Sequence, residues 1–182
     1  MQSSRQEDGF FGRIRYMRRA LFVIDVQRFF KNKETKSIAR KINNYIRKNK
    51  DKYSFIIFTV FRNDFKSPLW KIFKWKGCDK GKDIEIINEL SDLANNYTIV
   101  FRNTYSLFKI PQVQRKLKKY KIKQVDVCGF DTDACVLATT YDLFDSGYKP
   151  VILQDLCFSS SKEKLHKPAL KIIERNCGFL TK

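Results

Sequence analysis

The chain has 182 residues, of which 43% are hydrophobic, and 37 Lys and Arg residues against 19 Asp and Glu give a formal net charge of +18. This length provides one sizeable core but is short for two ordinary domains, and the hydrophobic content excludes a disordered chain. The longest apolar runs have the length of strands, so the sequence predicts no membrane-spanning segment.

Apolar periodicity divides the chain into alternating strands and helices. Short continuous apolar runs predict buried parallel strands, and apolar residues recurring every three or four positions predict helices with one buried side. In chain order, the predicted elements are a strand at Ala20–Val26, a helix at Glu34–Lys50, a strand at Ser54–Phe61, a helix at Asp83–Leu93, a strand at Thr98–Phe101, a helix at Gln112–Tyr120, a strand at Gln124–Val127, a helix at Ala134–Ser146, a strand at Val151–Gln154, a helix at Pro168–Asn176 and a short last strand at Phe179–Thr181. This alternation predicts an α/β fold with a mostly parallel sheet between two layers of helices.

The N-terminus and the cysteines bear on domain organisation and compartment. Residues 1–16 lack the apolar segment of a signal peptide and are predicted to be a disordered basic leader, followed by a single domain at 17–182. The five cysteines form no CxxC pair, and their odd number favours reduced thiols in a cytoplasmic protein. We also expect a homo-oligomer.

The segment from Gln124 to Tyr148 carries the strongest sign of chemistry. A short buried strand is followed by a tight turn beginning at Gly129 and then by a helix, which places Cys135 in the first turn of that helix. Unpaired N–H groups and the positive end of the helix dipole favour a thiolate there, as a nucleophile requires. The alternative interpretation is a small buried cysteine of the core.

Three motifs resemble those of the isochorismatase-like cysteine hydrolases, and they occur in the order typical of that family. The stretch GFDTDACVLAT contains Cys135, an apolar strand ends in D-x-Q at Asp25 and Gln27, and RNTYSLF supplies Arg102 and Tyr105. Together they span almost the whole chain, from Ala20 to Asn176. The resemblance implies a three-layer α/β/α fold with a six-stranded sheet in the order 3-2-1-4-5-6. Strands one and four are then neighbours, so Asp25 and Cys135 meet at the point where the winding reverses.

The same resemblance implies roles for individual residues. Cys135 would be the nucleophile, Asp25 would accept the thiol proton and later activate water, and Arg102 would supply the third catalytic group. The family's cis peptide bond would join Phe130 and Asp131 and aim backbone N–H groups at an oxyanion. Candidates for lining the substrate pocket are Gln27, Phe30, Trp70, Tyr105 and Phe158.

Two positions depart from the patterns of the family. The third catalytic residue is usually lysine, whereas here it is Arg102, which keeps the charge but holds its proton and is able to lock Asp25 in a bidentate pair. Nicotinamidase-like members carry an Asp/His/His metal cluster after the second strand. The corresponding stretch from Phe61 to Cys78 contains no histidine, so we predict neither a catalytic metal nor another cofactor.

These observations leave three functions open. The first is a metal-independent cysteine hydrolase that cleaves a C–N bond of a small amide. The second is a catalytically impaired member that binds a small molecule or a partner protein, which Arg102 favours. The third is a nucleic-acid-binding protein, but the basic residues are spread over every segment without a recognisable motif, which predicts at most nonspecific binding to nucleic acid.

Overall fold

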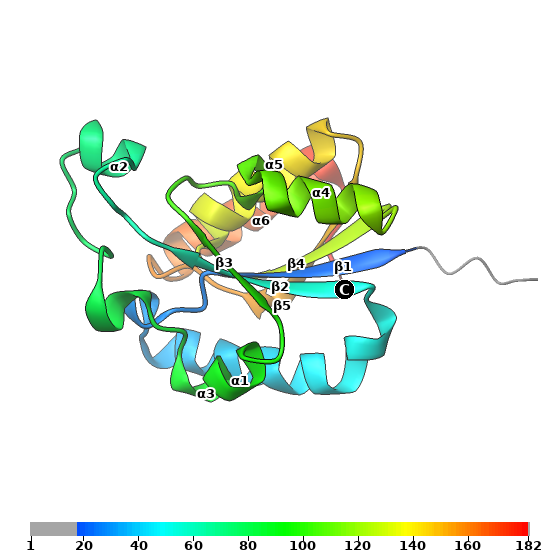
Figure 1. Ribbon diagram of the computed structural model, residues 1–182, viewed down its shortest axis with the longest axis horizontal. Coiled ribbons are helices and arrows are strands. Elements are labelled where there is room, and N and C mark those ends of the chain that lie inside the picture. The colour runs from blue at the N-terminus through cyan, green and yellow to red at the C-terminus, as the bar shows by residue number, and fades with distance from the viewer. Residues whose placement is uncertain (1–17, 182) are drawn as a thin grey trace, which may run out of the picture.

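The computed structural model describes residues 18–181, and the predicted leader at 1–16 lies outside the described residues. One parallel sheet forms the middle layer (Figure 1). Its strands are β1 (Arg19–Ile24), β2 (Phe55–Phe61), β3 (Thr98–Arg102), β4 (Gln124–Gly129) and β5 (Lys149–Cys157), in the order β3-β2-β1-β4-β5.

The predicted fold class is confirmed, but the predicted number of strands is wrong. The segment expected to form a sixth strand makes only an isolated parallel bridge between Leu180 and Ile152. Strand β5 is instead longer than expected, running from Lys149 to Cys157. The last apolar segment is too short for a ladder, and its two backbone hydrogen bonds to Ile152, from the Ile152 N–H to the Phe179 carbonyl and from the Thr181 N–H to the Ile152 carbonyl, form one bridge beside β5.

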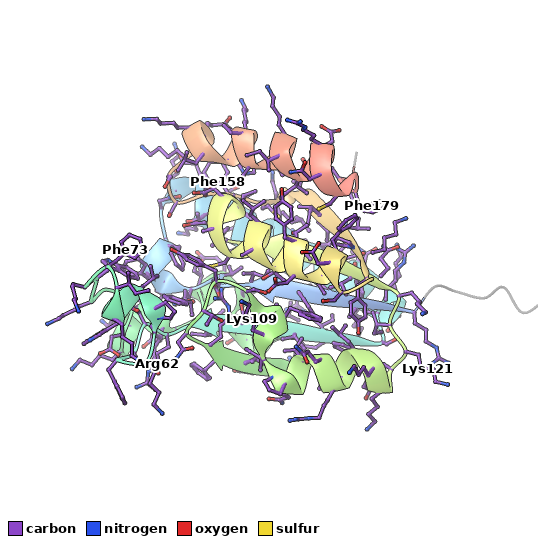
Figure 2. The ribbon with its side chains drawn as sticks, turned by 90° about the horizontal axis from the view of Figure 1, so that it is seen from above. Arg62, Phe73, Lys109, Lys121, Phe158 and Phe179 are labelled. Carbon is purple, nitrogen blue, oxygen red and sulfur yellow. The ribbon has the colours of Figure 1, made fainter. Side chains whose placement is uncertain are left out.

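Helices cover both faces of the sheet (Figure 1). The elements are α1 (Lys33–Asn49), α2 (Pro68–Lys71), α3 (Asn88–Ala94), α4 (Pro111–Lys119), α5 (Leu137–Asp145) and α6 (Glu163–Cys177), with 3-10 turns at Arg28–Phe30, Lys50–Lys52, Gly81–Ile84 and Leu107–Lys109 and a π-helical turn at Thr132–Val136. Helices α1 and α3 pack on one face, and Figure 2 shows α4, α5 and α6 side by side over the other. The short α2 belongs to the long segment between β2 and α3, beyond the carboxyl ends of the strands (Figure 1).

Local sequence explains where the helices begin. Asn32 caps α1 in a capping box, in which its side chain accepts from the Thr35 N–H at 2.8 Å and its own N–H donates to the Thr35 hydroxyl at 2.7 Å. Helix α6 begins five residues before the predicted start at Pro168. Pro168 therefore lies inside the helix, past its first turn, where it has no N–H to donate to the helix, so this proline does not mark the first helical residue.

The centre of the sheet is apolar on both faces, as expected for a covered parallel sheet. All residues of β1 after Arg19 are inaccessible to solvent, as are Val125 and Val127 of β4. Among residues 18–181, none of the helices combines the length and the apolar character that a membrane span requires.

The winding reverses between β1 and β4, and Gly129 makes the close contact of their ends possible. Gly129 pairs with Ile24 at the carboxyl end of both strands and has a φ of +114°. A Cβ atom there would lie 2.0 Å from the Ile24 carbonyl oxygen, so only glycine fits. The reversal opens a crevice at this edge of the sheet, the usual position of a ligand site in such folds.

Candidate active site

Three residues from separate segments meet at the carboxyl edge of the sheet. Asp25 follows β1 directly, Arg102 is the last residue of β3, and Cys135 lies in the π-helical turn after β4. Strand β2 lies between β1 and β3, so the long Arg102 side chain reaches past the end of β2 to form an ion pair with the Asp25 carboxylate. The sheet order therefore brings together three side chains that are up to 110 positions apart in the sequence.

Asp25 is fully buried and held by Thr59, a residue that the sequence interpretation missed. The Thr59 hydroxyl donates to Asp25 Oδ1 at 2.7 Å and accepts from the Asp25 N–H at 3.1 Å. Asp25 also has a φ of +48°, an uncommon conformation for a residue other than glycine. The sequence did contain a sign of this contact, because Thr59 is the single polar residue of the apolar strand FIIFTVF. A buried hydroxyl needs a hydrogen-bond partner, so a polar group was to be expected next to it.

Arg102 does not form the bidentate pair that its planar side chain made possible. Its Nη2 contacts Asp25 Oδ2, whereas its Nη1 donates to the carbonyl oxygen of Thr104. The Nε atom is buried and has no hydrogen-bond partner within the described part of the chain. The expected lock on both carboxylate oxygens is therefore wrong, because Thr59 occupies Oδ1 and the backbone of Thr104 takes the second guanidinium nitrogen.

Burial of Cys135 favours its neutral thiol, whereas the position in a helical turn was expected to favour a thiolate. Burial raises its pKa to about 12; the Arg102 guanidinium lowers the pKa and the Asp25 carboxylate raises it. The two charges oppose each other beside the sulfur, so desolvation decides the direction. Deprotonation of the thiol then requires a base in direct reach, and Asp25 is the carboxylate that faces it.

Cys135 opens onto a cavity of about 270 Å³ with largely aromatic walls. Two of the predicted pocket residues, Phe30 and Tyr105, line it. The sequence interpretation missed the remaining wall residues, which are Phe29, Phe61, Leu69, Trp75 and Ala134. Trp75 stacks on Phe61 with ring centroids 6.5 Å apart and meets the edge of Phe29 at 5.5 Å. The aromatic residues in the segment after β2 were the sequence feature that could have indicated these walls. Their contacts with the cavity could not be predicted, because that segment is a loop without hydrophobic periodicity.

Three other predicted pocket residues do not line this cavity. Gln27 is buried, and its side-chain amide pairs with the Phe61 backbone, accepting at 2.8 Å and donating at 2.9 Å. Gln27 therefore does not contact the cavity but holds the backbone of Phe61, whose side chain forms one of its walls. Phe158 packs against His166 with ring centroids 5.0 Å apart, and Trp70 lies under the Lys76 ammonium group.

The turn that carries Cys135 is held by the loop after β5. The peptide bond between Phe130 and Asp131 is cis, and Asp131 lines the cavity. The Asp131 carboxylate accepts from the Ser160 N–H at 2.7 Å and from the Ser160 hydroxyl at 2.6 Å. The Thr132 N–H donates to the Phe158 carbonyl at 3.2 Å, and the Thr132 hydroxyl contacts His166 Nδ1 at 2.9 Å.

A second cavity of about 400 Å³ adjoins the first and shares Phe61, Leu69 and Tyr105 as walls. It is bounded by residues of the β3–α4 connection and of α5, among them Lys109 and Asp142. Figure 2 shows Lys109 near the start of α4, on the side of the sheet that α5 also covers. Tyr105 lines both cavities and is half exposed, so this ring lies between them at the surface.

The residues present do not suit a catalytic metal ion. Between residues 18 and 181, no group of three or more His, Cys, Asp or Glu side chains is arranged to hold one. The buried Asn63, in the segment after β2, donates to the carbonyls of Trp75 at 2.8 Å and Gly77 at 3.0 Å. The single histidine, His166, is bound to Thr132. The metal-free site therefore stays a prediction that this donor set supports.

Cys135 is expected to react with iodoacetamide before the other four cysteines, because it alone among them lines the inner cavity. Its pKa is raised, so the thiolate fraction grows with pH, and the labelling rate should rise about tenfold per pH unit between pH 7 and 9. Peptide mapping by mass spectrometry measures both quantities. Earlier labelling of Cys78 or Cys177 would contradict the first expectation, and a rate independent of pH would contradict the second.

Comparisons with known proteins agree with this architecture. The isochorismatase domain model matches residues 19–182. Nicotinamidase 3 of Arabidopsis thaliana is 30% identical over 170 residues, covering 88% of this chain and 83% of the relative. Isochorismatase family protein 1B of Dictyostelium discoideum is 27% identical over 165 residues, covering 89% and 73%.

Solved structures show the same fold. A nicotinamidase from Bacillus subtilis superposes with a TM-score of 0.80 at 23% identity, covering 91% of this chain and all of the other. A pyrazinamidase of Pyrococcus horikoshii in complex with zinc gives a TM-score of 0.75 at 24% identity, covering 90% and 98%. With the domain match over nearly the whole chain, the strand order and the relatives, we conclude that the chain belongs to the isochorismatase family of hydrolases.

Proposed function

We propose that this protein hydrolyses the C–N bond of a small amide through a covalent intermediate on Cys135, without a metal ion. The observation that carries the proposal is the convergence of the Cys135 thiol, the Asp25 carboxylate and the Arg102 guanidinium at the end of one cavity. A buried base beside a thiol that opens onto a cavity is the arrangement needed for nucleophilic catalysis.

Each step of this reaction has a proton carrier. Cys135 Sγ attacks the amide carbon while its proton passes to Asp25, and the negative charge collects on the amide oxygen. The intermediate collapses with cleavage of the C–N bond, and Asp25 returns the proton to the leaving nitrogen, which departs as ammonia or an amine. Asp25 then takes a proton from water as the water attacks the thioester, and the released sulfur recovers that proton as the acid leaves.

Arg102 and the backbone of the turn would stabilise the charges that develop. Arg102 keeps a fixed positive charge beside Asp25 and Cys135, which lowers the cost of forming the thiolate as the proton leaves. The N–H groups of Asp131 and Cys135 would face the oxyanion at the positive end of the helical turn. A low-dielectric, closed site increases the effect of both.

The size of the inner cavity favours a small substrate. Its volume of about 270 Å³ is below the roughly 300–1,000 Å³ of pockets for drug-sized ligands. The flat rings of Phe61 and Trp75, stacked at an interplanar angle of 13°, form walls suited to a planar group. A single-ring aromatic amide matches both features.

The test is release of ammonia from a panel of small amides by the purified protein, with Cys135→Ala as control. A second measurement is intact mass after rapid acid quench, where an acyl group on Cys135 reports the covalent intermediate. We expect release of ammonia by the parent and none above background by the Cys135→Ala variant. Equal release by both proteins would refute the role of Cys135.

A second candidate function is a binding module without turnover. It is favoured by the contacts of Asp25, whose two carboxylate oxygens are engaged by Thr59 and Arg102. Under this alternative, Cys135→Ala would bind the same amides as the parent, and the parent would release no ammonia and form no acyl-enzyme. The panel above therefore distinguishes the two functions.

A further inference from the structure

The inner cavity is acidic although the protein as a whole is strongly basic. Among the described residues that line it, Asp131 is the one that carries a charge. The charges of Asp25 and Arg102 behind it cancel in their ion pair. The formal charge around the cavity is therefore −1, against +18 for the chain. We propose that Asp131 and the aromatic walls select amide substrates that carry a positive charge, such as a pyridinium or ammonium group, a specificity that rests on the proposed amide hydrolysis.

The aromatic walls suit a cation as much as a planar ring. Phe29, Phe30, Phe61, Trp75 and Tyr105 surround a cavity of about 270 Å³. The faces of aromatic rings attract cations, and the attraction grows when water is excluded. The Arg102 guanidinium lies 5.5 Å from the centroid of the Phe61 ring, so one ring of the site already makes a cation–π contact within the protein.

The Asp131 carboxylate is fixed in place and keeps capacity for a ligand. Ser160 supplies one hydrogen bond to each carboxylate oxygen, and each oxygen is able to accept a second. Burial raises the pKa of Asp131 to about 6; the Ser160 hydrogen bonds lower it, and Asp133 and Asp25 raise it. Asp131 therefore carries its charge at pH 7.5, and an anionic substrate would meet an unbalanced negative charge there.

Three ligands of nearly the same shape test the proposal: 1-methylnicotinamide, which is a cation, 3-methylbenzamide, which is neutral, and 3-carboxybenzamide, which is an anion. Their binding to Cys135→Ala is measured by calorimetry at pH 7.5, and their hydrolysis by the parent through ammonia release. We expect the cation to bind at least about tenfold more tightly than the neutral amide, and the anion more weakly than both.

Asp133 offers a matched control for Asp131. It lies two residues away in the same turn, and its carboxylate accepts from the Ser159 hydroxyl as that of Asp131 accepts from Ser160, but it does not line the cavity. In the Cys135→Ala background, Asp131→Asn should bring the affinity ratio of cation to neutral amide close to one. Asp133→Asn removes the same charge and should keep the ratio.

The possible outcomes separate this inference from the proposed function. Preferential binding of the cation that is lost only in Asp131→Asn supports the inference even if the parent hydrolyses none of the three amides, which would count against the proposed function. Hydrolysis with equal or better use of the neutral or anionic amide would support the function and overturn the inference. Equal effects of Asp131→Asn and Asp133→Asn would also overturn it, because the general field of the protein would then explain the preference.

Discussion

Asp25→Asn is expected to lower amide hydrolysis by about 10²–10⁴-fold, the usual contribution of a general acid–base residue. The same change should reduce the free energy of unfolding by about 3–5 kcal/mol, because it leaves the buried Arg102 charge without its partner. Asparagine has nearly the size of aspartate and still offers an oxygen to the Thr59 hydroxyl. The loss therefore reports the charge and the proton, which ammonia release and denaturant unfolding measure separately.

A double variant separates the two effects of Asp25→Asn. Adding Arg102→Gln removes the unpaired charge, and neutral residues in place of a buried ion pair are often tolerated. The double variant should recover most of the unfolding free energy and none of the activity. Recovery of activity with stability would show that Asp25 acts only through the fold, and a stable Asp25→Asn single variant would show that the ion pair contributes nothing.

The apolar pattern predicted the architecture well because each of the five strands contains a short run of apolar residues. The sequence cannot show how long a strand remains paired, because pairing depends on the neighbouring strand. Strand β5 spans the nine residues Lys149–Cys157, although the predicted strand was Val151–Gln154 and its continuous apolar run is only Val151–Leu153. The same limit applies to Phe179–Thr181, where a strand-like segment finds only one bridge, at Leu180. Pairing is a tertiary property and overrides local pattern.

The residues of the candidate site divide in the same way. Asp25, Arg102 and Cys135 lie in recognisable motifs at the ends of strands, and the structure brings them together. Thr59 and Trp75 belong to no motif and reach the site only through the sheet order and the loop after β2. Such residues are visible only once the fold is known.

The ionisation state of Cys135 shows why a motif alone does not determine chemistry. Its position in the first helical turn predicted a thiolate, but the thiol is 5% exposed, and burial raises its pKa to about 12. The dipole of one helix is worth less than the desolvation of a fully enclosed charge. The chemistry then depends on transfer of the thiol proton to Asp25 beside the fixed charge of Arg102.

Arg102→Lys is expected to raise the turnover of small amides about tenfold, or to create turnover if the parent has none, because lysine shifts its pKa and exchanges its proton more readily than arginine. The buried Nε of Arg102 has no hydrogen-bond partner among residues 18–181, and Nη1 donates to the Thr104 carbonyl. The ammonium group of lysine presents three donors from one atom, so it is able to follow the charge between Asp25 and Cys135. Turnover is measured as ammonia release on the same amide panel.

Arg102→Ala is the matched control for Arg102→Lys, because alanine removes the positive charge of residue 102, whereas lysine keeps the charge and changes only the shape of the cation. The Cys135 thiol then loses the Arg102 charge, which lowers its pKa, and its iodoacetamide labelling at pH 8 should slow by about tenfold or more. Arg102→Lys should keep the labelling rate near that of the parent, since the charge remains. If both variants are labelled as fast as the parent, the guanidinium does not act on the thiol. If Arg102→Lys is labelled at the normal rate but hydrolyses amides no faster, the proton on residue 102 takes no part in the reaction. Arginine would then serve as the third residue as well as lysine does.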